Sequence, residues 1–316
     1  MNSPQTKNAD TQSGFGFIDW MLSLGMALTW GSSFLLIDIA IRHFHTSVIP
    51  MGRTGFGVAA LLLLPSARHR IAREHWSRLF VLGFVWMALP FLLYPLAEHT
   101  VSSSITGMMN GALPVVVAVV TAIWIQTLPS GRRMFAVLIG FCGILLIALP
   151  SINDGSAADV KGILYLVAAL LSYAVAINIA RPLQTIYTPG TLMLHVEIVA
   201  FVMSAPYGVW GLSHSTFSIS SLSALAVLGV LGTGFAFVLF ATLSKRTGAV
   251  RSMIPTYFTP IVGTVLGTTF NNEPLLILSV VGMFVVIIGA YLMSKPDSLS
   301  TNHLPAITKN PSSSKA

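Results

Sequence analysis

The sequence predicts an all-α polytopic membrane protein, with ten transmembrane helices arranged as two inverted five-helix repeats. Three observations predict this fold class. Of the 316 residues, 54% are hydrophobic and only 9% are charged, whereas a soluble domain usually carries about 25% charged residues. Long apolar runs recur along the chain, and about 20 such residues cross a bilayer. Two distant stretches also resemble each other.

Ten apolar runs are continuous rather than alternating, which favours helices over the strands of a barrel. They cover residues 17–41, 47–64, 79–97, 104–128, 134–152, 162–180, 191–210, 222–243, 252–270 and 274–294. Residues 1–16 form a polar tail without the features of a cleaved signal peptide. Residues 295–316 are rich in Ser, Pro, Asn and Thr, which predicts a disordered tail.

The distribution of basic residues predicts the orientation. Most of the 17 lysines and arginines fall in connections on one side of the predicted membrane, whereas Glu98, Asp154, Asp159 and Glu273 fall on the other. Cytoplasmic connections carry the excess of Lys and Arg, so both termini are expected in the cytoplasm. The net charge of +7 therefore indicates membrane topology, and no nucleic-acid partner is expected.

The two halves share a pattern. Residues 104–124 and 250–270 carry Pro114 and Pro260 at matching places, and each stretch precedes a short polar turn and an apolar run with glycines. We expect a first repeat at 17–152 and a second at 160–294. Because five spans is an odd number, the second repeat must be inverted. Secondary transporters often have this plan, with the substrate site between the repeats.

Several motifs in order resemble those of one family, across about residues 20–294. They are LTWGSSF at 28–34, Arg53 in the second span, ALPV at 112–115, FTPI at 258–261, and Asn272-Glu273-Pro274 followed by Gly282 and Gly289. This order resembles EamA-type proteins of the drug/metabolite transporter superfamily. The resemblance implies a ten-helix exporter or importer of metabolites, amino acids or drugs in a bacterial inner membrane. Two places depart from the family pattern: residues 129–132 lack an acid, and Asp38 replaces a frequent basic residue.

Four formal charges fall inside the predicted spans: Asp19, Asp38, Arg53 and Glu197. Such residues lie near the surface or serve a function, because a charge in the bilayer centre costs several kcal/mol. Asp19 is in the first turn of its helix and can reach the headgroups. Asp38 and Arg42, four residues apart, are expected to pair on one helix face, and a role of Asp38 at the outer mouth is the alternative.

Arg53 lies about two turns into its span and could contact substrate or tether a neighbouring helix. Glu197 lies at a nearly equivalent inverted position. It could exchange a proton and couple transport to a proton gradient, or it could pair with Arg181 near the surface. Both hypotheses stay open for each residue.

Aromatic and amide side chains within the spans could line a cavity for a small amphipathic solute. The better candidates are Trp30, Asn110, Tyr173 and Tyr257, whereas Tyr94 and Trp124 lie near span ends, where interfacial aromatics are common. With the two charged residues, the expected substrate-binding set is Trp30, Arg53, Asn110, Tyr173, Glu197 and Tyr257.

No enzymatic activity, cofactor or metal site is expected. The sequence has no H-E-x-x-H, no G-x-S-x-G and no P-loop, and Cys142 is its single cysteine. The expected function is secondary transport, most simply export, of small metabolites, amino acids or drugs by alternating access. The expected partners are the lipid bilayer and a small-molecule substrate, and a homodimer is left open. A non-transporting interaction or sensory module is the alternative.

Overall fold

The structure is a computed structural model that describes residues 16–126, 131–153, 157–247 and 255–294. Both predicted tails therefore lie outside the described residues, apart from Gly16. All secondary structure in the described part is helical. The bounds are α1 (Phe17–Ile41), α2 (Val48–Leu62), η1 (Pro65–Ala67), η2 (Arg73–His75), α3 (Trp76–Leu82), η3 (Gly83–Ala88), α4 (Leu89–Glu98), α5 (Ser103–Asn110), α6 (Leu113–Trp124), α7 (Gly131–Asn153), α8 (Ala157–Ile186), α9 (Pro189–Leu212), α10 (Ile219–Gly229), η4 (Val230–Phe235), α11 (Ala236–Thr247), α12 (Pro255–Phe270) and α13 (Ile277–Ser294).

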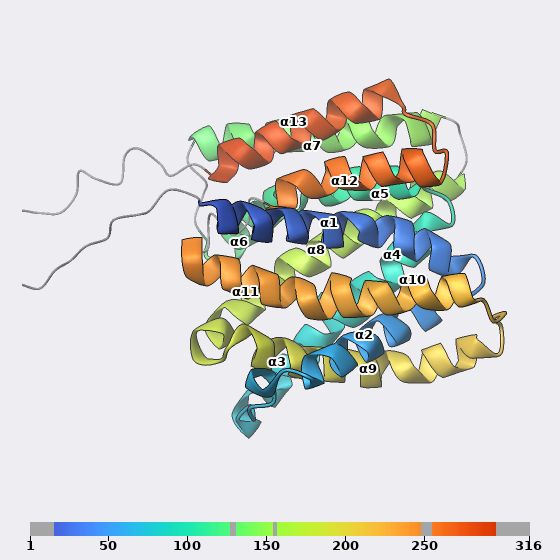
Figure 1. The fold of residues 1–316 in the computed structure, drawn as a ribbon. Helices are drawn as coiled ribbons and strands as arrows, with labels where there is room; N and C mark the ends of the chain where they lie inside the picture. The colour runs from blue at the N-terminus through green and yellow to red at the C-terminus, as the bar shows by residue number, and fades with distance from the viewer. Residues whose placement is uncertain (1–15, 127–130, 154–156, 248–254, 295–316) are drawn as a thin grey trace, which may run out of the picture.

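The helices lie side by side in one bundle (Figure 1). Helix α1 runs through the middle, in contact with α12 on one flank and with α10 and α11 on the other. Helices α7 and α13 pair along one edge of the bundle, and α2 and α9 pair toward the opposite edge. Helix α1 ends at the same end of the bundle at which α10 begins and α12 ends, and we call this end the Asp38 end.

Five described segments are long and apolar enough to cross a membrane, or six if the bent pair of α5 and α6 is one span. The five are Phe17–Ile41, Arg73–Glu98, Val160–Ile186, Pro189–Leu212 and Ile219–Phe240. Three further apolar helices, at Val48–Leu62, Met134–Pro150 and Ile277–Leu292, are shorter. The all-α fold is as predicted, and many large apolar side chains are exposed on the bundle, as expected for a protein surrounded by lipid.

The helix bounds agree with the predicted first span and differ in the fourth. Helix α1 covers the same residues as the predicted run at 17–41. The predicted run at 104–128 is broken after Asn110, and α5 and α6 meet at an angle of 42°. Pro114 is in the first turn of α6, a place where a proline is tolerated because its missing N–H has no partner within the helix.

Two π-helical segments interrupt long spans at related places. Segment η3 joins α3 to α4, and segment η4 joins α10 to α11. These are the predicted third span of the first repeat and the predicted third span of the second. A π-helical turn widens the helix and frequently lies at a functional site. Thr233 in η4 contacts the candidate site described below.

Glycines allow α7 and α13 to approach closely. A Cβ atom added at Gly143 would lie 2.8 Å from the carbonyl oxygen of Gly282, and one added at Gly282 would lie 2.8 Å from that of Gly143. A Cβ atom added at Gly289 would lie 2.8 Å from the backbone nitrogen of Gly140. Small residues at such crossings increase backbone contact, which stabilises helix pairs in a bilayer.

A Gly143→Ala variant is expected to lose about 1–3 kcal/mol of stability, because the added methyl group would force the two backbones apart. The matched control is Gly131→Ala on the same helix, since a Cβ at Gly131 meets no atom within 4 Å. Thermal unfolding in detergent measures both variants. Equal melting temperatures for the two would contradict the close crossing.

Candidate functional site

Arg53 is buried on α2, and two contacts fix its guanidinium group. Its Nε donates a hydrogen bond to Thr233 Oγ1 at 3.0 Å, and its Cζ lies 3.8 Å from the centroid of the Phe91 ring. Thr233 Oγ1 also donates to the Leu228 carbonyl at 3.3 Å. The hydroxyl of a residue in η4 therefore orients a guanidinium from α2.

The two Nη atoms of Arg53 are unpaired. Within the part of the chain that the structure describes, they make no hydrogen bond and Arg53 forms no ion pair. Neither Nη atom is among the fully enclosed polar atoms without a partner, so both retain contact with open space. A guanidinium presents its donors as a planar fork that matches a carboxylate or a phosphate. Arg53 is thus prepared to receive an anion.

Tyrosine and asparagine side chains from three other helices lie beside this group. Tyr94 on α4 donates a hydrogen bond to Asn110 Oδ1 on α5 at 2.8 Å. Its ring centroid lies 6.1 Å from that of Tyr173 on α8 and 5.8 Å from that of Phe34 on α1. Tyr94 and Tyr173 are both within electrostatic range of Arg53. Asn110 is the last residue of α5, so the break before α6 is next to the cluster.

Glu197 is fully buried on α9, at 0% exposure. Both of its carboxyl oxygens are enclosed and have no hydrogen-bond partner in the structure. A Cβ at Gly57 would collide with Glu197 Oε2, so the carboxyl group lies against the bare face of α2 one turn after Arg53. Arg53 is the charged group that acts on it, and Arg181 is exposed. The carboxyl group is therefore packed inside the bundle and not at its surface.

The structure brings four of the six predicted site residues into one region, namely Arg53, Asn110, Tyr173 and Glu197. Trp30 instead packs against the rings of Phe237 and Phe240 on α11, at 6.5 and 6.3 Å. Tyr257 donates a hydrogen bond to the Ala290 carbonyl on α13 at 3.1 Å. These two aromatic residues thus contact other parts of the bundle. We call Arg53, Tyr94, Asn110, Tyr173, Glu197 and Thr233 the central polar cluster.

Three members of the surroundings were not candidates from the sequence. Thr233 stands between two glycines in an apolar run, and nothing in that pattern indicates a partner for an arginine. Phe91 is one of many apolar residues. Tyr94 was assigned to the membrane interface, but it is only 3% exposed. The nearby Pro90 and Pro95 were the available signal that this helix is irregular.

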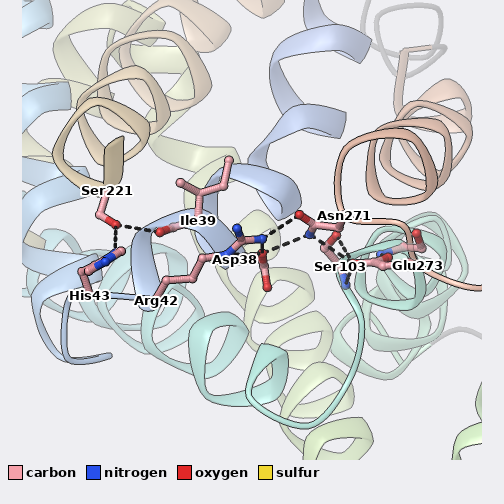
Figure 2. A network of polar contacts seen from close by, with 9 residues as sticks. Asp38, Ile39, Arg42, His43, Ser103, Ser221, Asn271 and Glu273 are labelled. Atoms are coloured by element: carbon pink, nitrogen blue, oxygen red, sulfur yellow. Dashed lines mark hydrogen bonds and ion pairs between the residues drawn. The ribbon is translucent and has the colours of Figure 1, made fainter. Parts of the chain in front are cut away.

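A second network ties the Asp38 end together (Figure 2). The predicted pair of Asp38 and Arg42 is confirmed, with 2.5 Å between Arg42 Nη2 and Asp38 Oδ2. Asn271, which follows α12, bridges this pair: it accepts from Arg42 at 2.7 Å and donates to Asp38 at 3.0 Å. On the other side of α1, Ser221 donates to the Ile39 carbonyl at 2.8 Å.

Glu273 extends this network to the start of α5. Its Oε1 accepts from the Ser103 backbone N–H at 3.0 Å and from the Ser103 hydroxyl at 2.7 Å, and its Oε2 accepts from the Ser104 backbone N–H at 2.8 Å. Partial burial alone would raise the pKa of Glu273, but hydrogen bonds from Ser104, Ser103 and Asn271 outweigh burial and lower that pKa below its ordinary value. A carboxylate at a helix N-terminus is stabilised in this way.

We expect a Glu273→Gln variant to lose about 1 kcal/mol of stability at neutral pH, because charge-assisted hydrogen bonds are lost from a half-buried group. Since the folded pKa lies below the unfolded one, the contribution is full above the unfolded value and disappears as the pH falls through the folded value. Melting temperatures between pH 7 and pH 3 therefore converge for the wild type and the variant. The exposed Glu74→Gln is the control, and a constant difference at all pH values would contradict the assignment.

Glu98 is within electrostatic range of both polar regions. The sequence placed it in an outer connection, but as the last residue of α4 it is only 8% exposed, and both carboxyl oxygens are enclosed without a hydrogen-bond partner. Asp38, Glu273 and Arg53 all act on it electrostatically. At the other end of α1, Asp19 Oδ1 accepts a hydrogen bond from Arg246 Nε at 2.5 Å. In the described ranges no group of three His, Cys, Asp or Glu side chains could hold a metal ion.

The profile of the EamA-like transporter family matches the chain twice, over residues 18–149 and 160–295. The chain belongs to the EamA-like transporter family. This confirms the resemblance drawn from the motifs, and it makes the chain a multi-pass membrane protein of a transporter family.

Two relatives and one solved structure are also similar to this chain. An "Uncharacterized transporter" of Archaeoglobus fulgidus is 20% identical over 274 residues, which are 87% of this chain and 98% of that protein. A second "Uncharacterized transporter", from Buchnera aphidicola subsp. Schizaphis graminum, is 24% identical over 162 residues, 49% of this chain and 53% of that protein. One protein crystal structure has a TM-score of 0.62 at 16% identity, covering 87% of this chain and 96% of that one; it supports the fold alone.

Proposed function

We propose that this EamA-family protein is a secondary transporter that moves small metabolites, amino acids or drugs across the bacterial inner membrane by alternating access. It would have ten spans in two inverted five-helix repeats, residues 17–152 and 160–294, with both termini in the cytoplasm. Its partners would be the bilayer and the carried solute. Because a secondary transporter is reversible, net flow follows the gradients, and we propose export from a cell that accumulates the solute.

The central polar cluster is the observation that carries the proposal. Arg53, Tyr94 and Asn110 come from the proposed first repeat, and Tyr173, Glu197 and Thr233 come from the second. Secondary transporters place the substrate site between their repeats. Burying a guanidinium without an ion-pair partner, or a carboxyl group without a hydrogen bond, is costly. Ionisable groups that persist inside a membrane bundle mark a substrate or ion pathway.

Matching features of the two halves support the inverted repeat. The family profile matches once in each half, and the π-helical segments η3 and η4 occupy related places. At the crossing of α5 and α12, a Cβ added at Gly107 would lie 3.3 Å from Gly263 Cα, and one added at Gly263 would lie 3.3 Å from Gly107 Cα. This close crossing packs a helix of the proposed first repeat directly against a helix of the proposed second repeat.

Flux measurements on purified protein in liposomes test the proposal. The panel comprises labelled amino acids, organic acids and cationic drugs, each with and without a pH gradient, followed by metabolite extracts. We expect at least one solute to move faster than in protein-free liposomes, and an Asn110→Ala or Tyr173→Ala substitution to slow it. If folded and inserted protein moves nothing from the panel or the extracts, the transporter proposal fails and a non-transporting interaction module is favoured.

A further inference from the structure

Resting on the proposed function, we propose that Arg53 binds the carboxylate of the transported solute, and that this solute is a small organic monoanion with an aromatic body. Tyr94 and Tyr173 would pack against that body. The proposal narrows a broad range of solutes to one chemical class, and it assigns a role to each side of the Arg53 guanidinium.

The need for an anion follows from the contacts of Arg53. Arginine stays protonated in proteins, so its positive charge is inside the bundle whether or not a ligand is bound. Thr233 occupies the Nε edge of the guanidinium and Phe91 covers one face. The Nη edge makes no hydrogen bond among the described residues, and it is not fully enclosed. This edge is the one that a carboxylate can engage with two parallel hydrogen bonds.

The neighbouring acidic groups do not fill this place. Glu197 has no accessible surface and its oxygens make no hydrogen bond, so it does not contact a ligand in this conformation. Glu98 is enclosed in the same manner. Both groups act on Arg53 electrostatically, and the structure shows no ion pair between either of them and Arg53.

The single guanidinium limits the charge of the ligand. One guanidinium compensates one negative charge. A phosphate monoester or another dianion would leave a second negative charge uncompensated inside the bundle, which is costly. A monoanion avoids this cost, and a carboxylate is the common organic monoanion that fits the guanidinium fork.

The aromatic side chains define the body of the ligand. Tyr173 lies in the middle of α8 and is half-buried, so part of its side chain is available for contact with a ligand. Its ring is 6.1 Å from that of Tyr94, which is 5.8 Å from that of Phe34. Aromatic pairs prefer offset or edge-to-face contacts at such separations. A ligand ring attached to a carboxylate could join this row while its charge reaches Arg53.

A matched series of ligands tests the proposal on the wild-type protein. The probes are phenylacetate, its neutral analogue phenylacetamide, the cationic phenethylamine, and the aliphatic carboxylates acetate to hexanoate. Binding is measured as the shift in melting temperature of purified protein in nanodiscs, and flux is measured in liposomes. We expect phenylacetate to bind at least tenfold more tightly than the amide or the amine, and more tightly than acetate.

Substitutions at Arg53 provide the second arm. Arg53→Gln is expected to lose the preference for phenylacetate over phenylacetamide, and Arg53→Lys to keep a weakened preference because it keeps the charge but not the fork. Arg181→Gln, at an exposed arginine, should leave the preference unchanged. If Arg53→Gln does not fold, the comparison of carboxylate with amide on the wild type still decides.

The outcomes separate this proposal from the transporter proposal. A preference for the amide or the amine, no response to any carboxylate, or a carboxylate preference that survives Arg53→Gln would each overturn the assignment. If a neutral or cationic solute moves in liposomes while no carboxylate binds, transport stands and the carboxylate proposal fails. If no solute moves although phenylacetate binds through Arg53, the binding site stands and transport fails.

Discussion

A Glu197→Gln variant is expected to carry its solute at equal pH on both sides and to lose the response to a pH gradient. The reason is charge compensation between Glu197 and Arg53. A carboxyl group that is enclosed without hydrogen bonds is costly in its charged form, and Arg53 is the group that offsets this cost. A solute carboxylate bound to Arg53 removes the compensation, so Glu197 takes up a proton. Anion and proton are then bound together.

Flux in liposomes with a gradient of one pH unit measures this effect. A one-to-one coupling gives the wild type up to about tenfold accumulation, since one pH unit is worth about 1.4 kcal/mol, and Glu197→Gln should give none. Glu74→Gln, at an exposed carboxylate, is the control. If gradient-driven accumulation persists in Glu197→Gln, then Glu197 is not the group that couples transport to the proton gradient.

A Thr233→Val variant is expected to lower the affinity for the transported solute by about tenfold to a hundredfold. Valine has nearly the shape of threonine but cannot accept the hydrogen bond from Arg53 Nε. A hydrogen bond to a charged group is worth about 1.5–3 kcal/mol, and its loss allows the guanidinium fork to move. The KM for the solute should rise more than the maximal rate falls, because the change affects binding in every state.

Thr233→Ser provides the matched control for this prediction. Serine restores the hydroxyl group and lacks only the methyl group, so most of the affinity should return. Thr242→Val controls for the loss of a threonine hydroxyl elsewhere, since Thr242 donates to the Val238 carbonyl on the exposed side of α11. If Thr233→Ser were as defective as Thr233→Val, the effect would come from packing of η4 and not from the position of Arg53.

Much of the fold could be predicted because hydrophobicity along the chain reports helices directly. The run at 17–41 coincides with α1, and the pairing of Asp38 with Arg42 followed from a spacing of four residues on one helix. The break between α5 and α6 could not be placed, because Pro114 is compatible with a kinked helix or with a new helix start. The π-helical segments also have no distinct sequence pattern.

The candidate site was predictable only in part, because a sequence shows which residues are in a span but not which way each one faces. Arg53 and Glu197 stood out because charges are rare inside spans. Trp30 was a predicted site residue and Tyr94 was placed near a span end, and only packing showed that Tyr94 is in the central polar cluster and that Trp30 is not. Glu98 appeared to lie in a connection because the predicted span ended at residue 97, yet its side chain is buried.

Accessibility of the central polar cluster from the two sides of the membrane is the most direct test of the account. Because Cys142 is the single cysteine, Asn110→Cys in a Cys142→Ser background gives one reactive thiol at the cluster. Leu171→Cys, on the exposed face of α8, is the lipid-facing control. A charged, membrane-impermeant thiol reagent is applied to right-side-out and to inside-out vesicles. Alternating access predicts labelling at Asn110→Cys from both sides and none at the control, whereas labelling from neither side would contradict a substrate site at the cluster.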